Sequence, residues 1–119
     1  MGKNIGVEKY LYDTLESIAA IREFSADIKD AHELSKRHLE RSAIERKFEI
    51  IGEALKNAEN VDRKTKLPIR NIKKIKDTRN IIVHDYDGIN YRIIWNVIEL
   101  HLDELEADVK NILSGNHSG

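Results

Sequence analysis

The stretch IERKFEIIGEALKNA, residues 44–58, carries apolar residues at every third or fourth position. The stripe that they form consists of Ile44, Phe48, Ile51, Leu55 and Ala58. This spacing matches the turn of an α-helix and predicts a helix that presents one apolar face to a core. Gly52 interrupts a run of good helix formers, and a glycine inside a helix costs stability relative to alanine. We therefore expect another helix to approach closely at Gly52.

Outward from this stretch, the same spacing recurs along most of the chain. The four segments with helical periodicity are residues 7–29, 34–58, 69–83 and 91–113. Pro68 is well placed at the start of the third segment, and Asp87-Gly88 forms a turn pair before the fourth. Strand signals are nearly absent. The sequence predicts an all-α, up-and-down four-helix bundle over residues 1–113, followed by a disordered polar tail at 114–119.

The composition narrows the class of protein. The chain has 119 residues, the size of one compact domain, and no cysteine, so disulfides and thiolate metal sites are excluded. No stretch is apolar enough to span a bilayer, and residues 1–8 lack the apolar run of a secretory signal, which predicts a cytoplasmic protein. The five histidines show no metal-ligand spacing, and there is no glycine-rich phosphate loop. We expect neither a metal nor a cofactor.

The charges are distributed unevenly along the chain. The formal net charge is only -1, yet residues 63–79 hold eight basic side chains against one acid, Asp77. Acidic side chains gather instead in the last helical segment. Such polarity can attract a polyanion to one face of a nearly neutral protein. Charge alone, however, favours an ordinary solvated helix face.

Two arginines break the apolar stripes. Arg79 occupies a position in the third segment that the apolar spacing assigns to the core. A buried guanidinium without a partner is very costly, so Arg79 either pairs with a buried carboxylate or lines a cleft, and the pattern leaves both open. Arg46 raises the same question in the second segment. There we favour a salt-bridge network, because Glu49 and Glu53 are near enough in sequence to share its helix surface.

The residues RNIIVHDY, 79–86, put an arginine, an asparagine, a histidine and a tyrosine around one predicted helix end. Together, such side chains can hold a phosphate, orient it and move protons. His84 follows Arg79 by five residues, which on a continuous helix places the two on different faces. They meet only if the helix ends near Val83, or if two copies of the chain bring them together. Taken singly, His84 would be a helix cap and Tyr86 a packing side chain.

At these residues the sequence resembles a known family. Residues 79–86 match the R-x4-H-x-Y form of the HEPN motif. Residues 45–54, ERKFEIIGEA, are similar to the R-x-L-E-I-I-G-E-A signature of the HepT toxins. Shorter matches fall at residues 67–69 and 93–95, so the resemblance covers residues 10–113.

The resemblance implies a fold, an activity and a site. HEPN domains are helical bundles that dimerise and bring two Arg–His motifs into one cleft, and the family acts as metal-independent endoribonucleases. Arg79 would then grip a phosphate, and His84 would serve as base or acid. Asn80 would position the phosphate or the Arg–His pair. The expected products are a 2′,3′-cyclic phosphate and a 5′-hydroxyl.

The basic run would hold the RNA backbone without reading bases. The side chains expected to do so are Arg70, Lys73, Lys74 and Lys76.

The resemblance also implies a partner. HepT proteins form type VII toxin–antitoxin pairs with a small MNT-type nucleotidyltransferase, which would transfer AMP to Tyr86 and so silence the toxin. Two rival interpretations explain the same residues. In one, the chain is a non-catalytic nucleotide- or partner-binding subunit of a nucleotidyltransferase. In the other, it is a structural dimerisation bundle in which Arg79 is a buried ion-pair partner, so that Arg79→Ala would unfold the protein.

Overall fold

The computed structural model describes residues 5–61, 66–84 and 88–115, with the backbone alone at Ile5, Val83 and His84. Within these ranges it contains six helices and no strand. The helices are α1 (Ile5–Ser25), α2 (Ala31–Lys36), α3 (His38–Val61), α4 (Ile72–His84), α5 (Tyr91–Leu100) and α6 (Leu102–Gly115). The all-helical fold predicted from the sequence is confirmed.

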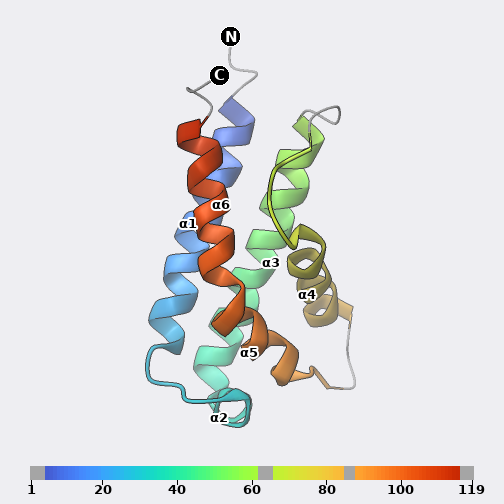
Figure 1. Ribbon diagram of the computed structural model, residues 1–119. Helices are drawn as coiled ribbons and strands as arrows, with labels where there is room; N and C mark the ends of the chain where they lie inside the picture. The colour runs from blue at the N-terminus through green and yellow to red at the C-terminus, as the bar shows by residue number, and fades with distance from the viewer. Residues whose placement is uncertain (1–4, 62–65, 85–87, 116–119) are drawn as a thin grey trace.

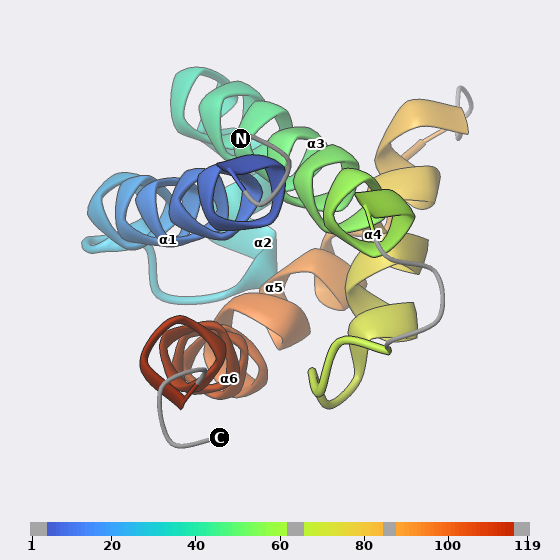
Figure 2. The same cartoon turned by 90° about the horizontal axis from the view of Figure 1, so that it is seen from above.

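Among the four longest helices, α1 runs down the molecule and α3 and α6 run up it, whereas α4 is seen nearly end-on and crosses them (Figure 1). The first of them, α1, begins at the same end at which the last, α6, terminates. Seen from above, α3 lies between α1 and α4, and α6 lies beside α1 (Figure 2). The shorter helices α2 and α5 pack against each other towards the opposite end. The central helix is therefore α3, and α4 packs on the side of α3 that faces away from α1.

Apolar side chains from all six helices form one core. From α3, Ile44, Phe48, Ile51 and Leu55 are fully buried, which confirms the stripe predicted for residues 44–58. The other helices add mainly Leu11, Ile18, Ile21, Leu34, Ile75, Ile94, Leu102, Leu105 and Val109. Burying a side chain of this size contributes about 1.5–3 kcal/mol, so the core is the main source of stability. None of the helices in the described ranges is long and apolar enough to cross a membrane.

Two of the predicted helical segments are broken by single residues. Arg37 separates α2 from α3 with φ -87° and ψ 79°, and its backbone N–H donates to the carbonyls of Glu33 and Leu34. A ψ of this size is not helical, so α3 starts in a new direction. His101 separates α5 from α6 with φ -120° and ψ -14°, and its N–H still donates to the Val97 carbonyl. The last helix then continues through Gly115, two residues past the predicted end.

The start of α4 is fixed by a contact with α6. We expected a helix from residue 69, but α4 begins at Ile72 because the preceding backbone is held elsewhere. The Arg70 N–H donates to the Asp108 carboxylate at 2.8 Å, and the Arg70 guanidinium binds the same carboxylate at 3.0–3.2 Å. Asn71 then takes a left-handed φ of 58°, and its carbonyl accepts the first bond of the helix from Ile75. A salt bridge thus decides where the helix bearing Arg79 begins.

Candidate functional site

Arg79 lies on the side of α4 that faces α3, directly over Gly52. A Cβ atom built on Gly52 would stand 2.7 Å from the Arg79 Cβ, 2.8 Å from its Cγ and 3.0 Å from its Cδ. Real Cβ contacts are almost never under 3.0 Å, so only glycine fits here. The close approach predicted from Gly52 is confirmed, and the neighbour is the arginine that interrupts the apolar stripe.

The guanidinium of Arg79 forms an ion pair with Glu53, but the Arg79 side chain is not fully buried. Its Nη2 lies 3.5 Å from Oε2 of Glu53, and the two side chains are 30% and 48% exposed. The Nε atom is buried and has no hydrogen-bond partner among the described residues. Glu53 is therefore not the buried carboxylate that a structural core arginine would need. The geometry is that of an arginine at the edge of a cleft.

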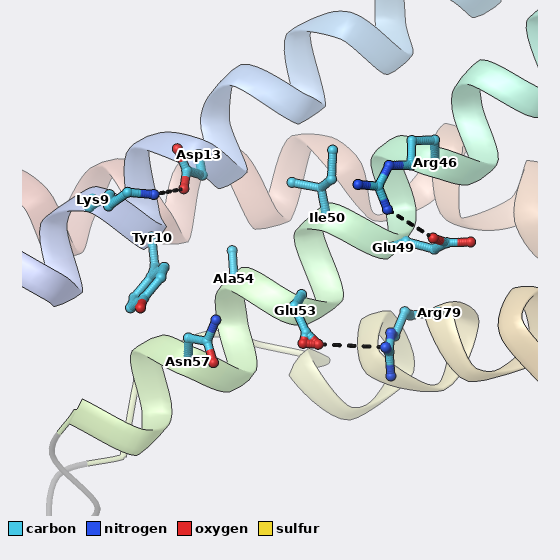
Figure 3. Close-up of a pocket in the computed structure, with 10 residues that line it drawn as sticks. All are labelled: Lys9, Tyr10, Asp13, Arg46, Glu49, Ile50, Glu53, Ala54, Asn57 and Arg79. Carbon is cyan, nitrogen blue, oxygen red and sulfur yellow. Dashed lines mark hydrogen bonds and ion pairs between the residues drawn. The ribbon is translucent and has the colours of Figure 1, made fainter.

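A pocket of about 340 Å³ opens beside Arg79, on the face of α3 between α1 and α4 (Figure 3). Its lining residues are Lys9, Tyr10, Asp13, Arg46, Glu49, Ile50, Glu53, Ala54, Asn57 and Arg79. Each cation on its wall has a carboxylate beside it, since Lys9 pairs with Asp13 at 2.9 Å and Arg46 pairs with Glu49 at 3.2 Å. The pocket wall is therefore close to neutral, with the Arg79–Glu53 pair on the α4 side.

Arg46 itself is exposed, at 69% of its side chain, rather than buried. The expected pair with Glu49 is present, and the Arg46 Nη1 donates a hydrogen bond to it. Glu53, which we placed in the same network, points instead across to Arg79 (Figure 3).

The helix that carries the motif is unbroken between Arg79 and His84. The last residue of α4 is His84, so the backbone stays helical over all five steps. At about 100° per residue, the two positions stand about 140° apart around the helix axis. Within one chain they therefore occupy different faces of α4. The His84 side chain and residues 85–87, with Tyr86, lie outside the described residues.

Three of the four cations expected to hold RNA already have carboxylate partners. Arg70 binds Asp108, Lys76 binds Glu59 at 2.8 Å, and Lys73 binds Asp77 at 2.8 Å. Lys74 is exposed and has no ion pair among the described residues. Its ammonium group is therefore the most readily available of the four.

Lys73 and Lys74 line a separate hollow of about 280 Å³ together with Asp77, Thr78, Ile81 and Ile93. None of these residues lines the pocket beside Arg79. Within one chain the lysines and Arg79 therefore serve different hollows. Asn80, next to Arg79 in sequence, is exposed on α4.

A family model described as Ribonuclease HepT-like matches residues 14–112 of the chain. The chain belongs to the HepT-like ribonuclease family. This HepT-like chain is also similar to curated proteins. A "Putative RNase" of Methanocaldococcus jannaschii is 36% identical over 104 residues, which is 87% of this chain and 94% of that protein. A second "Putative RNase" of the same organism is 31% identical over 108 residues, 89% of this chain and 84% of that protein.

A "Probable ribonuclease HepT" of Thermococcus cleftensis is 29% identical to the HepT-like chain over 105 residues, 87% of this chain and 92% of that protein. No solved structure matches the chain. The resemblance found in residues 45–54 and 79–86 is confirmed at the level of the family.

Two features of the HepT-like site were not assigned from the sequence. The sequence analysis paired Glu53 with Arg46, whereas in the structure Glu53 pairs with Arg79. It also did not identify Asn57 and Tyr10 as residues that line the pocket. The one usable signal was Gly52, because a helical glycine marks a close approach and Glu53 follows it directly. In chemical terms, the site offers a permanently charged guanidinium beside a pocket whose wall carries three cations and three carboxylates.

Proposed function

We propose that this HepT-like chain is a metal-independent endoribonuclease that cuts RNA with Arg79 and His84 across the cleft of a homodimer. One observation carries the proposal: Arg79 interrupts an apolar stripe yet stands at the edge of a pocket, where its 30% exposed side chain has only a 3.5 Å ion pair with Glu53 among the described residues. A guanidinium in that position can bind a phosphate in a two-pronged way. Family membership supports RNA as the source of that phosphate.

The cleavage needs no external nucleophile, because RNA carries a 2′-hydroxyl beside each phosphate. One His84 removes the hydroxyl proton, the 2′-oxygen attacks phosphorus, and the bond to the 5′-oxygen breaks. A second His84 delivers a proton to that leaving oxygen. Arg79 stabilises the negative charge that develops on the phosphoryl oxygens, and Asn80 orients the phosphate or the Arg–His pair. The products are a 2′,3′-cyclic phosphate and a 5′-hydroxyl.

The helix register of α4 supports the proposed dimer. Positions 79 and 84 stand about 140° apart around α4, which favours a site in which the two residues come from different chains. A two-fold axis beside α4 would let Arg79 of one copy face His84 of the other, and would supply two histidines, one as base and one as acid. The dimer is thus what completes the proposed site.

The proposed RNA-binding surface is the basic run on and before α4. Lys74, which has no ion pair in the described part of the chain, would contact the RNA backbone directly, with Lys73 beside it. Arg70, Lys73 and Lys76 would act mainly through the positive electrostatic potential that they contribute, because carboxylates already bind them. These contacts hold phosphates and carry no base specificity.

The proposed regulation acts at Tyr86. An MNT-type nucleotidyltransferase partner would bind a nucleoside triphosphate, and the Tyr86 oxygen would attack its α-phosphorus. Pyrophosphate would leave, the phenolic proton would be lost, and AMP would stay on the tyrosine. The added negative charge, two residues past His84, would repel RNA and compete for Arg79. The chain would thus be the toxin of a toxin–antitoxin pair.

The deciding experiment is cleavage of end-labelled RNA in EDTA by the wild-type protein, by His84→Ala and by His32→Ala. The exposed His32 on α2 provides the matched control. We expect cleavage with cyclic-phosphate ends by wild type and His32→Ala, and none by His84→Ala, which should remain a dimer on gel filtration. Full activity of His84→Ala would overturn the mechanism. An inactive, unmodified, folded wild type would favour the rival function, a non-catalytic nucleotide- or partner-binding subunit of a nucleotidyltransferase.

A further inference from the structure

Arg79 is held from one side by two consecutive residues of α3. Gly52 faces the aliphatic part of the side chain, from Cβ to Cδ, and Glu53 faces the guanidinium at 3.5 Å. These two contacts act on different parts of the same arginine. Together they place the stem of the side chain against Gly52 and the guanidinium beside Glu53, at the edge of the pocket (Figure 3).

We propose that Gly52 and Glu53 are positioning residues for Arg79: glycine provides a slot for its stem, and glutamate aims its guanidinium at the substrate phosphate. This inference rests on the proposed ribonuclease function for the identity of the phosphate. It deepens that function by assigning roles to two residues outside the Arg–His motif.

The slot depends on the missing side chain of Gly52. An alanine there would meet the Arg79 Cβ at 2.7 Å, and that atom is attached directly to the α4 backbone. Rotating the arginine cannot relieve a contact with its own Cβ, so α4 must move away from α3. The guanidinium would move with it, and the pocket edge would change shape. One methyl group thus displaces the catalytic cation without removing it.

Glu53 orients the guanidinium and leaves its donors free. At 3.5 Å the ion pair is longer than a strong hydrogen bond, and Arg79 donates no hydrogen bond to any described residue. An arginine has five N–H donors, so a phosphate can still take two of them side by side. The neighbouring Glu49 does not compete, because it already accepts from Arg46.

The test compares Gly52→Ala and Glu53→Gln with two matched controls. Gly6→Ala also adds a methyl group to a helical glycine, but its Cβ would meet only side chains, at 3.4 Å or more. Glu106→Gln neutralises the carboxylate of another interhelix pair with arginine, between α6 and Arg22 of α1, away from the pocket. Thermal unfolding of all four variants shows that each is folded before the other measurements are made.

The first measurement needs no activity. The Arg79 Nε–H should give a slowly exchanging signal in a nitrogen–proton correlation spectrum, because the atom is buried, and Arg79→Lys identifies that signal by its loss. We expect Gly52→Ala to expose the proton and speed its exchange at least tenfold, and Glu53→Gln to shift the signal. Exchange as slow in Gly52→Ala as in Gly6→Ala, with no shift in Glu53→Gln, would overturn the positioning roles.

The second measurement is steady-state RNA cleavage. We expect Gly52→Ala to lower kcat roughly 100-fold, the size of effect expected from misplacing a catalytic group by about 1 Å, with little change in KM. Glu53→Gln should also lower kcat, while KM falls or stays level because a negative charge near RNA is gone. Unchanged kcat in both variants would contradict the proposal. A wild type that never cleaves RNA would instead refute the function, and the exchange measurement would still decide whether Arg79 is positioned.

Discussion

Arg70 encloses the carboxylate of Asp108 from two directions, with its backbone N–H at 2.8 Å and its guanidinium at 3.0–3.2 Å. Asp108 is only 6% exposed, so α6 carries a nearly buried charge whose partner lies just before α4. The pair therefore joins the last helix of the bundle to the helix that carries the motif.

Asp108→Asn tests this anchor through its pH dependence. Burial alone would raise the pKa of Asp108, but the bonds from Arg70 outweigh it and hold the pKa below its ordinary value of 3.8. A lowered pKa in the folded state adds stability that is full above the unfolded pKa and is lost as pH falls through the folded pKa. We expect the variant to lose about 1–3 kcal/mol of unfolding free energy at neutral pH. Its acid-induced loss below about pH 4 should be shallower than in wild type.

Urea unfolding at a series of pH values measures both effects. Glu106→Gln is a useful comparison, because its partner Arg22 joins α1 to α6 without touching the chain before α4. An Asp108→Asn curve parallel to wild type at every pH would show that this carboxylate does not titrate as the geometry requires.

The variant Arg79→Met distinguishes between two roles for Arg79, a cleft residue that binds substrate and a structural ion-pair partner. The variant keeps the aliphatic stem over Gly52 but removes the unpartnered Nε donor and the exposed ion pair with Glu53. A buried, unsatisfied donor costs about 1–3 kcal/mol, and an exposed pair contributes at most about 1 kcal/mol. We expect the unfolding free energy to stay level or rise by about 1 kcal/mol in chemical denaturation. A loss of stability would instead support the interpretation of Arg79 as a structural ion-pair partner.

The sequence located the helices well but not their breaks. Apolar spacing runs on at three and four residues through Arg37 and His101, because a break of one residue barely changes the phase of the stripe. The late start of α4 is also invisible locally, since its cause, Asp108, lies 38 residues further along the chain. Breaks of this kind depend on tertiary contacts rather than on propensity.

The same limit applies to the site. Arg79 could be singled out because a charged side chain on an apolar stripe contradicts its neighbours. Its ion-pair partner Glu53 could not be predicted, because Arg46 is an equally good partner for Glu53 by sequence spacing. Only the packing of α3 on α4 decides which arginine Glu53 pairs with. Gly52 gave the position of that packing but not the identity of the residue above it.

Lys74→Gln and Lys76→Gln test which lysines touch RNA. Each phosphate contact on a single strand contributes about 0.7 to the slope of log affinity against log salt. Lys74 has no ion pair in the described ranges, whereas Glu59 holds the Lys76 ammonium at 2.8 Å. Binding is measured at several salt concentrations in a His84→Ala background, which prevents cleavage. We expect the slope to fall by about 0.7 for Lys74→Gln and to change much less for Lys76→Gln. Equal slopes for the two variants would show that the ion pair with Glu59 does not keep Lys76 from contacting RNA phosphates.

Tyr86→Phe tests the proposed control by the antitoxin. The phenyl ring keeps nearly all of the tyrosine's volume but lacks the oxygen that would attack the α-phosphorus. We therefore expect the variant to stay toxic when expressed, and to stay toxic when an MNT-type nucleotidyltransferase is expressed with it. Tyr12→Phe, at an exposed position on α1, should be silenced as wild type is. Mass spectrometry should find one added AMP on wild type and Tyr12→Phe and none on Tyr86→Phe. If the nucleotidyltransferase silenced Tyr86→Phe as well, its effect would have to come from binding alone or from another acceptor, and Tyr86 would not be the control point.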